Sequence, residues 1–237
     1  MWYHNSARLF EWHAGCLHVI AKRALFFEAE FEKGLEFYRL NYFAHWEGEP
    51  IIGEARHRNL ILPYIPQRIY SVNPNAKLVV IARDPVKRAY SHYHHSVRRG
   101  CETLNFEDAI EKEKERINEE YDKMLKNESN TSSSFAAYSY LMRGKYINQV
   151  ERLFQYIPRN QVLIIKSEDF FEDPTKELQK VFSFLNVSPY KLHKYKIYGY
   201  HGYNKMNEKT RQYLIEYFKL FNYHLYEYLG INFNWEG

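Results

Sequence analysis

The segment from Asn73 to Ser91 limits the possible folds more than any other part of the chain. Leu78 to Ala82 form an unbroken apolar run with three β-branched residues, the pattern of a strand covered on both faces in a parallel sheet. Pro85 fits the first turn of a helix, where a missing N–H costs nothing, and Asp84 can cap that helix. Ligands of open α/β sheets bind beyond the carboxyl ends of the strands, so Arg83 stands where an anion would bind.

The rest of the chain alternates between helical and extended patterns. We expect helices over residues 34–46, 64–72, 106–126, 138–156, 174–185 and 208–229, strands over 50–54 and 162–165, and a polar loop over 127–134. Residues 1–33 are the least readable part. The alternation predicts an α/β fold with a central parallel sheet flanked by helices.

Length and composition indicate the number of domains, the kind of partner and the cellular environment of the chain. The 237 residues suffice for one large α/β domain, so we expect a single domain over residues 1–237. A net charge of +4 favours anionic partners only mildly and does not indicate DNA or RNA binding. Two cysteines without metal-ligand spacing indicate a reducing, cytoplasmic environment and no metal site. No apolar stretch is long enough to cross a bilayer, which predicts a soluble chain with no membrane span.

The helix that begins at Pro85 carries the residues that could bind an anion. Positions 84, 88 and 91 share one helical face. Arg83 at the strand end and Ser91 two turns along the helix can converge on a phosphate, through paired guanidinium donors and one hydroxyl. In the alternative interpretation, Arg83 pairs with a neighbouring carboxylate and Ser91 hydrogen-bonds to its own helix. Spacing alone favours that alternative.

Residues 83–93, Arg-Asp-Pro-Val-Lys-Arg-Ala-Tyr-Ser-His-Tyr, resemble the 3′-phosphate-binding segment of sulfotransferases that use 3′-phosphoadenosine 5′-phosphosulfate (PAPS). The resemblance is strongest to the branch that contains bacterial and heparan-sulfate enzymes. It continues in the same order and spacing at residues 34–38, 52–54, 144–146, 167–174 and 229–235. This similarity covers most of residues 22–236 and implies a P-loop-like sulfotransferase fold.

The resemblance also implies an activity and a site. Arg83 and Ser91 would hold the 3′-phosphate, with the loop around Gly202 and Tyr203 closing on the nucleotide. The partners would be PAPS and an acceptor, and adenosine 3′,5′-bisphosphate would be the product. A sulfuryl group would move from PAPS to a hydroxyl or amine of a glycan or small metabolite. Such a transfer needs a base, and we rank His94 first because it follows the nucleotide-binding segment.

The sequence departs from the family pattern on the side where the chemistry occurs. The family opens with a strand and a Gly- and Ser/Thr-containing loop that cradles the 5′-phosphosulfate, but Gly15 is the only glycine before Gly34. Arg23 stands at the position of a family glutamate that can act as a base, and arginine cannot. Residues 55–58, Ala-Arg-His-Arg, replace a pattern of small residues and proline.

Two interpretations of these departures remain open. In the first, the sequence is an N-terminally truncated sulfotransferase. In the second, it is a degenerate relative that keeps half of the nucleotide site. The alternative function is therefore a catalytically impaired module that binds nucleotide or sulfated glycan without turnover.

Overall fold

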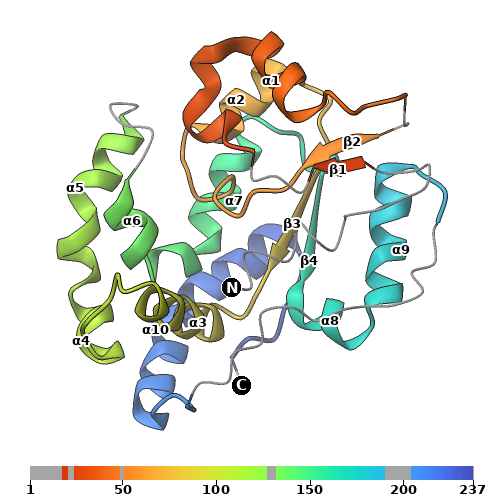
Figure 1. The fold of residues 1–237 in the computed structure, drawn as a ribbon. Helices are drawn as coiled ribbons and strands as arrows, with labels where there is room; N and C mark the ends of the chain where they lie inside the picture. Colours follow the sequence, from red (N-terminus) through yellow and green to blue (C-terminus); the bar gives the residue numbers. More distant parts are fainter. Residues whose placement is uncertain (1–17, 21–23, 49–50, 127–131, 190–203, 237) are drawn as a thin grey trace. The chain divides into compact units, whose positions relative to one another are not determined.

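The computed structural model describes residues 18–20, 24–48, 51–126, 132–189 and 204–236 (Figure 1). The chain divides into two compact units. Unit 1 comprises residues 1–81, 156–165 and 169–200, and unit 2 comprises residues 82–155, 166–168 and 201–237. The expectation of a single domain remains a prediction, and each unit is described by itself below.

The strands of the described part of the chain form two pairs. β1 (His18–Ile20) pairs in parallel with β2 (Ile52–Glu54), so that Val19 lies opposite Gly53. β3 (Leu78–Ala82) pairs with β4 (Val162–Lys166). Strands and helices alternate along the chain, which confirms the α/β class predicted from the sequence.

Short helices surround the strands of unit 1. The π-helical turn η3 (Phe26–Glu30), the 3₁₀ turn η4 (Phe31–Lys33) and α1 (Gly34–Tyr42) follow one another directly. The remaining helices of unit 1 are α2 (Ile65–Val72), η6 (Arg159–Gln161) and α9 (Pro174–Leu185). Most of α8 (Ser167–Glu172) also belongs to this unit. Phe26 is fully buried and stacks on Tyr38 of α1 with ring centroids 4.1 Å apart, so η3 and α1 share one aromatic core.

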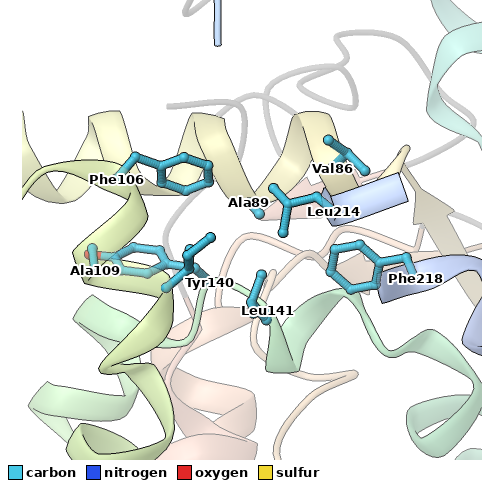
Figure 2. Packing of buried hydrophobic residues seen from close by; sticks show 9 residues of the cluster. Val86, Ala89, Phe106, Ala109, Tyr140, Leu141, Leu214 and Phe218 are labelled. Carbon is cyan, nitrogen blue, oxygen red and sulfur yellow. The ribbon is translucent and has the colours of Figure 1, made fainter. Parts of the chain in front are cut away.

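Unit 2 is helical and has its own hydrophobic core (Figure 2). Its helices are α3 (Pro85–Arg98), α4 (Phe106–Glu111), α5 (Glu113–Leu125), α6 (Ser133–Tyr138), the 3₁₀ turn η5 (Met142–Gly144), α7 (Tyr146–Phe154) and α10 (Glu208–Leu229). The core is formed by Val86, Ala89, Phe106, Ala109, Ile110, Tyr140, Leu141, Leu214 and Phe218. Because α3 and α10 both contribute to it, the helix that begins at Pro85 is held along its length.

The strand-to-helix junction predicted from the sequence is confirmed. β3 covers Leu78–Ala82 and α3 begins at Pro85, with Asp84 as its N-cap. The strand is less buried than expected, because only Ala82 is fully buried and the four residues before it are half-buried. The predicted strand at 162–165 and the helices at 174–185 and 208–229 are also confirmed, with the last helix capped by Asn207.

Two long helices predicted from the sequence are wrong. Residues 106–126 form α4 and α5, which are separated at Lys112. Residues 138–156 contain the end of α6, η5 and then α7, and Gly144 lies so close to Phe218 that an added Cβ would be 2.7 Å from its ring. Ser133 and Ser134 begin α6 and do not belong to a loop, because the Ser132 side chain accepts a hydrogen bond from the Phe135 N–H and caps the helix.

No helix in the described ranges combines the length and the apolar character needed to cross a membrane.

Candidate nucleotide-binding site

Arg83 lies between β3 and α3, at the position predicted from the sequence, and its side chain is half-buried. The Tyr146 hydroxyl donates to the carbonyl oxygen of Arg83 at 3.0 Å and accepts a long hydrogen bond, 3.5 Å, from the Arg83 N–H. Trp235 packs against Tyr146 with ring centroids 5.7 Å apart. The backbone of Arg83 is therefore held in place although it lies outside both the strand and the helix.

The side chain of Asp84 accepts hydrogen bonds from backbone N–H groups at the start of α3. Its Oδ1 accepts from the N–H groups of Val86 and Lys87 at 2.9 and 3.2 Å, and its own N–H donates to Oε1 of Glu168 at 3.1 Å. Free N–H groups at a helix start commonly bind anions, but here two of them are taken by a carboxylate of the chain itself. A phosphate next to Arg83 would therefore be held by side chains.

Ser91 and Arg88 lie on the buried face of α3, 8% and 4% exposed. The Arg88 guanidinium donates to the carbonyl oxygen of Tyr140. The Ser91 hydroxyl forms no hydrogen bond with any other described residue, so the alternative in which it bonds to its own helix is not observed. Ser91 lies about 9 Å along the helix axis from Pro85. The roles of Arg83 and Ser91 in phosphate binding remain predictions.

Two histidines of α3 have lowered pKa values for different reasons. His94 is half-buried and meets Tyr90 edge-to-face at 4.4 Å, and burial with the nearby Arg98 lowers its pKa. His92 is fully buried, with Nε2 3.0 Å from the carbonyl oxygen of Ala136. Burial, followed by the charges of Arg143 and Arg88, lowers the pKa of His92 well below its usual value. Both rings are therefore neutral near pH 7, and the catalytic role of His94 remains a prediction.

Glu113 is a buried carboxylate that was not among the residues predicted from the sequence. It is 4% exposed and accepts hydrogen bonds from the N–H groups of Leu141 and Met142 at 2.5 and 2.7 Å. Burial raises its pKa to about 7, against the opposing effect of these hydrogen bonds. Glu113 lies three residues after Ile110 and four before Ile117, so all three share one helical face, and this spacing could have indicated that Glu113 is buried.

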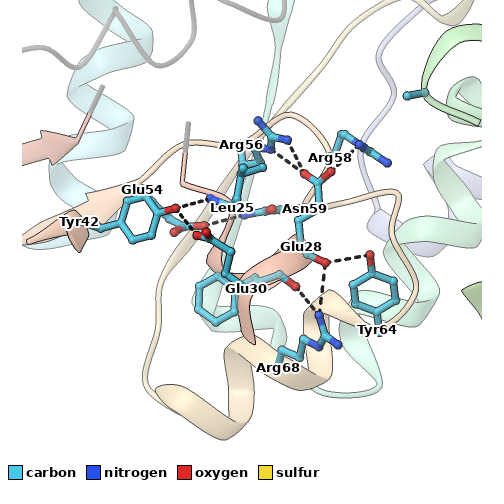
Figure 3. Close-up of polar contacts among 12 residues, drawn as sticks. Leu25, Glu28, Glu30, Tyr42, Glu54, Arg56, Arg58, Asn59, Tyr64 and Arg68 are labelled. Carbon is cyan, nitrogen blue, oxygen red and sulfur yellow. Dashed lines mark hydrogen bonds and ion pairs between the residues drawn. The ribbon is translucent and has the colours of Figure 1, made fainter. Parts of the chain in front are cut away.

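A second group of charged side chains lies in unit 1 (Figure 3). Glu28 accepts from Arg56 through Oε2, at 2.7 Å from Nε and 2.6 Å from one Nη, and pairs with Arg58 through Oε1. Arg68 approaches the same turn and donates to the carbonyl oxygen of Phe27 at 2.8 Å. We call Glu28, Arg56 and Arg58 the Glu28 cluster. In the sequence, the only indication of this cluster was that residues 55–58 depart from the family pattern of small residues and proline.

Other predicted positions lie outside the described residues. These are Gly202, Tyr203 and Arg23. Among the residues that the structure does describe, no three or more His, Cys, Asp or Glu side chains are arranged to hold a metal ion.

Comparison with known proteins identifies the family. The model of the sulfotransferase domain family matches residues 17–222. A crystal structure of a sulfotransferase from Alicyclobacillus acidocaldarius superposes with a TM-score of 0.77 at 26% identity, over 99% of this chain and 92% of that chain. The fold is thus that of a sulfotransferase. The chain belongs to the sulfotransferase family.

Curated relatives share this family but are longer. The membrane-associated sulfotransferase kil1 of Dictyostelium discoideum is 24% identical over 95% of this chain and 62% of its own length. Heparan sulfate glucosamine 3-O-sulfotransferase 5 of Mus musculus is 30% identical over 72% of this chain and 45% of its own length. The chain therefore spans roughly half of these relatives, 62% and 45% respectively.

Proposed function

We propose that this chain is a sulfotransferase that uses PAPS, and that Arg83 and Ser91 hold the 3′-phosphate of the nucleotide. The observation that carries the proposal is the junction of β3 and α3. Tyr146 fixes the backbone of Arg83, and Asp84 takes two N–H groups of the helix start. The guanidinium would therefore contact the anion, with the buried Ser91 hydroxyl as a further donor. The loop around Gly202 and Tyr203 is part of the same proposal.

The proposed reaction is an in-line transfer. Bound PAPS supplies the sulfuryl group, and the acceptor oxygen or nitrogen bonds to sulfur as the bond between sulfur and the 5′-phosphate oxygen breaks. The acceptor proton passes to a base, and cationic donors stabilise the charge that develops on the phosphate. We propose His94 as the base, because its lowered pKa leaves the ring neutral and able to accept a proton near pH 7.

A glycan is the acceptor class that we favour. The support is the similarity to a heparan sulfate glucosamine 3-O-sulfotransferase, which is 30% identical over 72% of this chain. A small metabolite remains the other class that the sequence allowed. We also propose a cytoplasmic location, supported by the exposed free thiol of Cys101.

Isothermal titration calorimetry with adenosine 3′,5′-bisphosphate tests the nucleotide site. Arg83→Ala is expected to bind at least about tenfold more weakly, because it loses a charged donor to the phosphate. Arg211→Ala removes a surface guanidinium of α10 that pairs with Glu208, and serves as the matched control with unchanged affinity. Equal affinity of Arg83→Ala and the control would reject the role of Arg83.

A second function, nucleotide or sulfated-glycan binding without turnover, is favoured by one observation, the arginine at position 23 where the family places a base. Transfer of radiolabelled sulfate from PAPS to a glycan panel separates the two functions. Transfer that depends on Arg83 supports the enzyme. Intact nucleotide binding without transfer supports the binding module.

A further inference from the structure

The Glu28 cluster contains more positive than negative charge. One carboxylate faces two guanidinium groups, and the side chains of Glu28, Arg56 and Arg58 are 3%, 9% and 11% exposed. A third cation, Arg68, hydrogen-bonds to carbonyl oxygens of the same turn and adds no negative charge. Charges shielded from water are costly unless each meets an opposite charge. Glu54 also attracts Arg56 and Glu32 attracts Arg68, whereas Arg58 pairs with Glu28.

Arg58 also lacks hydrogen-bond acceptors. It pairs with Glu28 through one terminal nitrogen, whereas its Nε and its other Nη are shielded from solvent and have no hydrogen-bond partner. Buried donors are nearly always satisfied in proteins, and adjacent Nε and Nη groups form a fork that fits two oxygens of one anion. Arg58 thus offers an unused pair of donors.

The position of the cluster in the sheet supports a ligand site. β1 and β2 run parallel, and their last residues, Ile20 and Glu54, lie opposite each other. Arg56 and Arg58 follow the carboxyl end of β2 directly, and Glu28 lies in the first helical turn after β1. Ligands of parallel sheets bind at this edge.

We propose that the Glu28 cluster is a binding site for a tetrahedral oxyanion, sulfate or phosphate, which the free fork of Arg58 receives while its ion pair with Glu28 holds Arg58 in place. This site uses none of the residues that are proposed to contact the 3′-phosphate. The source of the oxyanion is either the sulfuryl end of a nucleotide or a sulfate group on a glycan.

Thermal unfolding in sodium sulfate and in sodium chloride at equal ionic strength tests the site. Sulfate stabilises most proteins by exclusion from their surface, so only the difference between variants counts. We expect the wild-type protein and Arg39→Ala to share the larger stabilisation by sulfate, and Arg58→Ala to lose the excess. Arg39 is the matched control because it pairs with Glu36 on α1 and is 66% exposed. An equal sulfate response in all three proteins would overturn the proposal.

Arg58→Lys keeps the proposal testable if Arg58→Ala does not fold. Lysine retains the charge but cannot present two donors in a fork, so the sulfate dissociation constant should rise at least about fivefold. An unchanged constant would overturn the proposal.

Calorimetry with two ligands identifies the source. Adenosine 5′-phosphosulfate carries no 3′-phosphate, so its binding does not require the proposed contact of Arg83 with that group, and glucosamine 6-sulfate represents the glycan. The ligand whose affinity falls at least about tenfold in Arg58→Ala is the source. If the sulfate response is lost but neither affinity changes, the site binds the free oxyanion. If the sulfate response and both affinities are unchanged, the cluster is not an oxyanion site.

Discussion

Glu28 in unit 1 and Glu113 in unit 2 are equally hidden from solvent, 3% and 4% exposed, but they are held by different partners. Glu28 pairs with two guanidinium groups. Glu113 accepts from two backbone N–H groups, and burial dominates the effect on its pKa. A carboxylate that accepts from the backbone stabilises the fold, whereas a carboxylate that pairs with two arginines also fixes the direction of their remaining donors.

The largest expected effect follows from removing the charge of Glu28. Glu28→Gln leaves Arg56 and Arg58 without their carboxylate, which should lower the free energy of unfolding by about 3 kcal/mol or more. Urea denaturation measures this change. Glu36→Gln is the control, because Glu36 is 74% exposed in its pair with Arg39 and should change stability by less than about 0.5 kcal/mol.

Sulfate sharpens this test. A bound oxyanion would supply the missing negative charge, so sulfate should restore part of the stability of Glu28→Gln, beyond its effect on the control. A loss below about 1 kcal/mol in Glu28→Gln would contradict the dependence of Arg56 and Arg58 on this carboxylate, which distinguishes the two glutamates.

A smaller, pH-dependent effect is expected for Glu113. Its pKa of about 7 in the folded protein lies above the usual 4.5. The stability that its protonated form contributes is therefore fully present below about pH 4.5 and is lost as the pH rises through about 7. Glu113→Gln cannot ionise and keeps one of the two accepting oxygens, so one of the two N–H groups loses its acceptor at every pH. The unfolding free energy of the wild type relative to this variant should fall by at least about 1 kcal/mol between about pH 5 and pH 8.

The control for this experiment lies on the same helix. Glu115 is exposed, and Glu115→Gln should show the same pH dependence as the wild type. A pH profile of Glu113→Gln that runs parallel to that of the wild type would show that backbone hydrogen bonds alone determine the behaviour of Glu113.

The smallest expected effect is that of Tyr146→Phe. The variant loses the hydrogen bond to the Arg83 carbonyl oxygen, worth about 1 kcal/mol. Because Tyr146 positions Arg83 and is not proposed to contact the ligand, adenosine 3′,5′-bisphosphate should bind only about two- to fivefold more weakly. Calorimetry measures the affinity, and Tyr213→Phe on the exposed face of α10 is the control. A loss as large as that of Arg83→Ala would mean that Tyr146 itself contacts the nucleotide.

The sequence was most informative where local chemistry determines structure. The apolar run of β3 and the Asp84-Pro85 pair predicted a junction that the structure confirms to the residue, and Asn207 predicted the cap of α10. The prediction of one helix failed for residues 106–126, which are separated at Lys112, and for residues 138–156, where a contact distant in sequence decides the outcome. Glu113 captures the N–H groups of Leu141 and Met142, so these groups do not belong to a continuous helix.

The candidate sites show the same difference between features that local sequence determines and features that depend on contacts distant in sequence. Arg83 and Ser91 could be selected from spacing and family resemblance because they lie in one short segment. The pairing of Glu28 with Arg56 and Arg58 spans about thirty residues and follows no periodicity. Its only trace in the sequence was that residues 55–58 depart from the family pattern, which marks a position without naming its partner.

Just after β3, the hydroxyl of Tyr146 makes the kind of hydrogen bonds to the backbone that a neighbouring strand would make. It offers one donor and one acceptor to the same residue, Arg83, as a peptide group in a sheet ladder does to its partner. The amide proton of Arg83 should therefore exchange with solvent deuterium more slowly than its position in a loop suggests. Tyr146→Phe should release it, so that a single amide records whether the anchor of the proposed nucleotide site is intact.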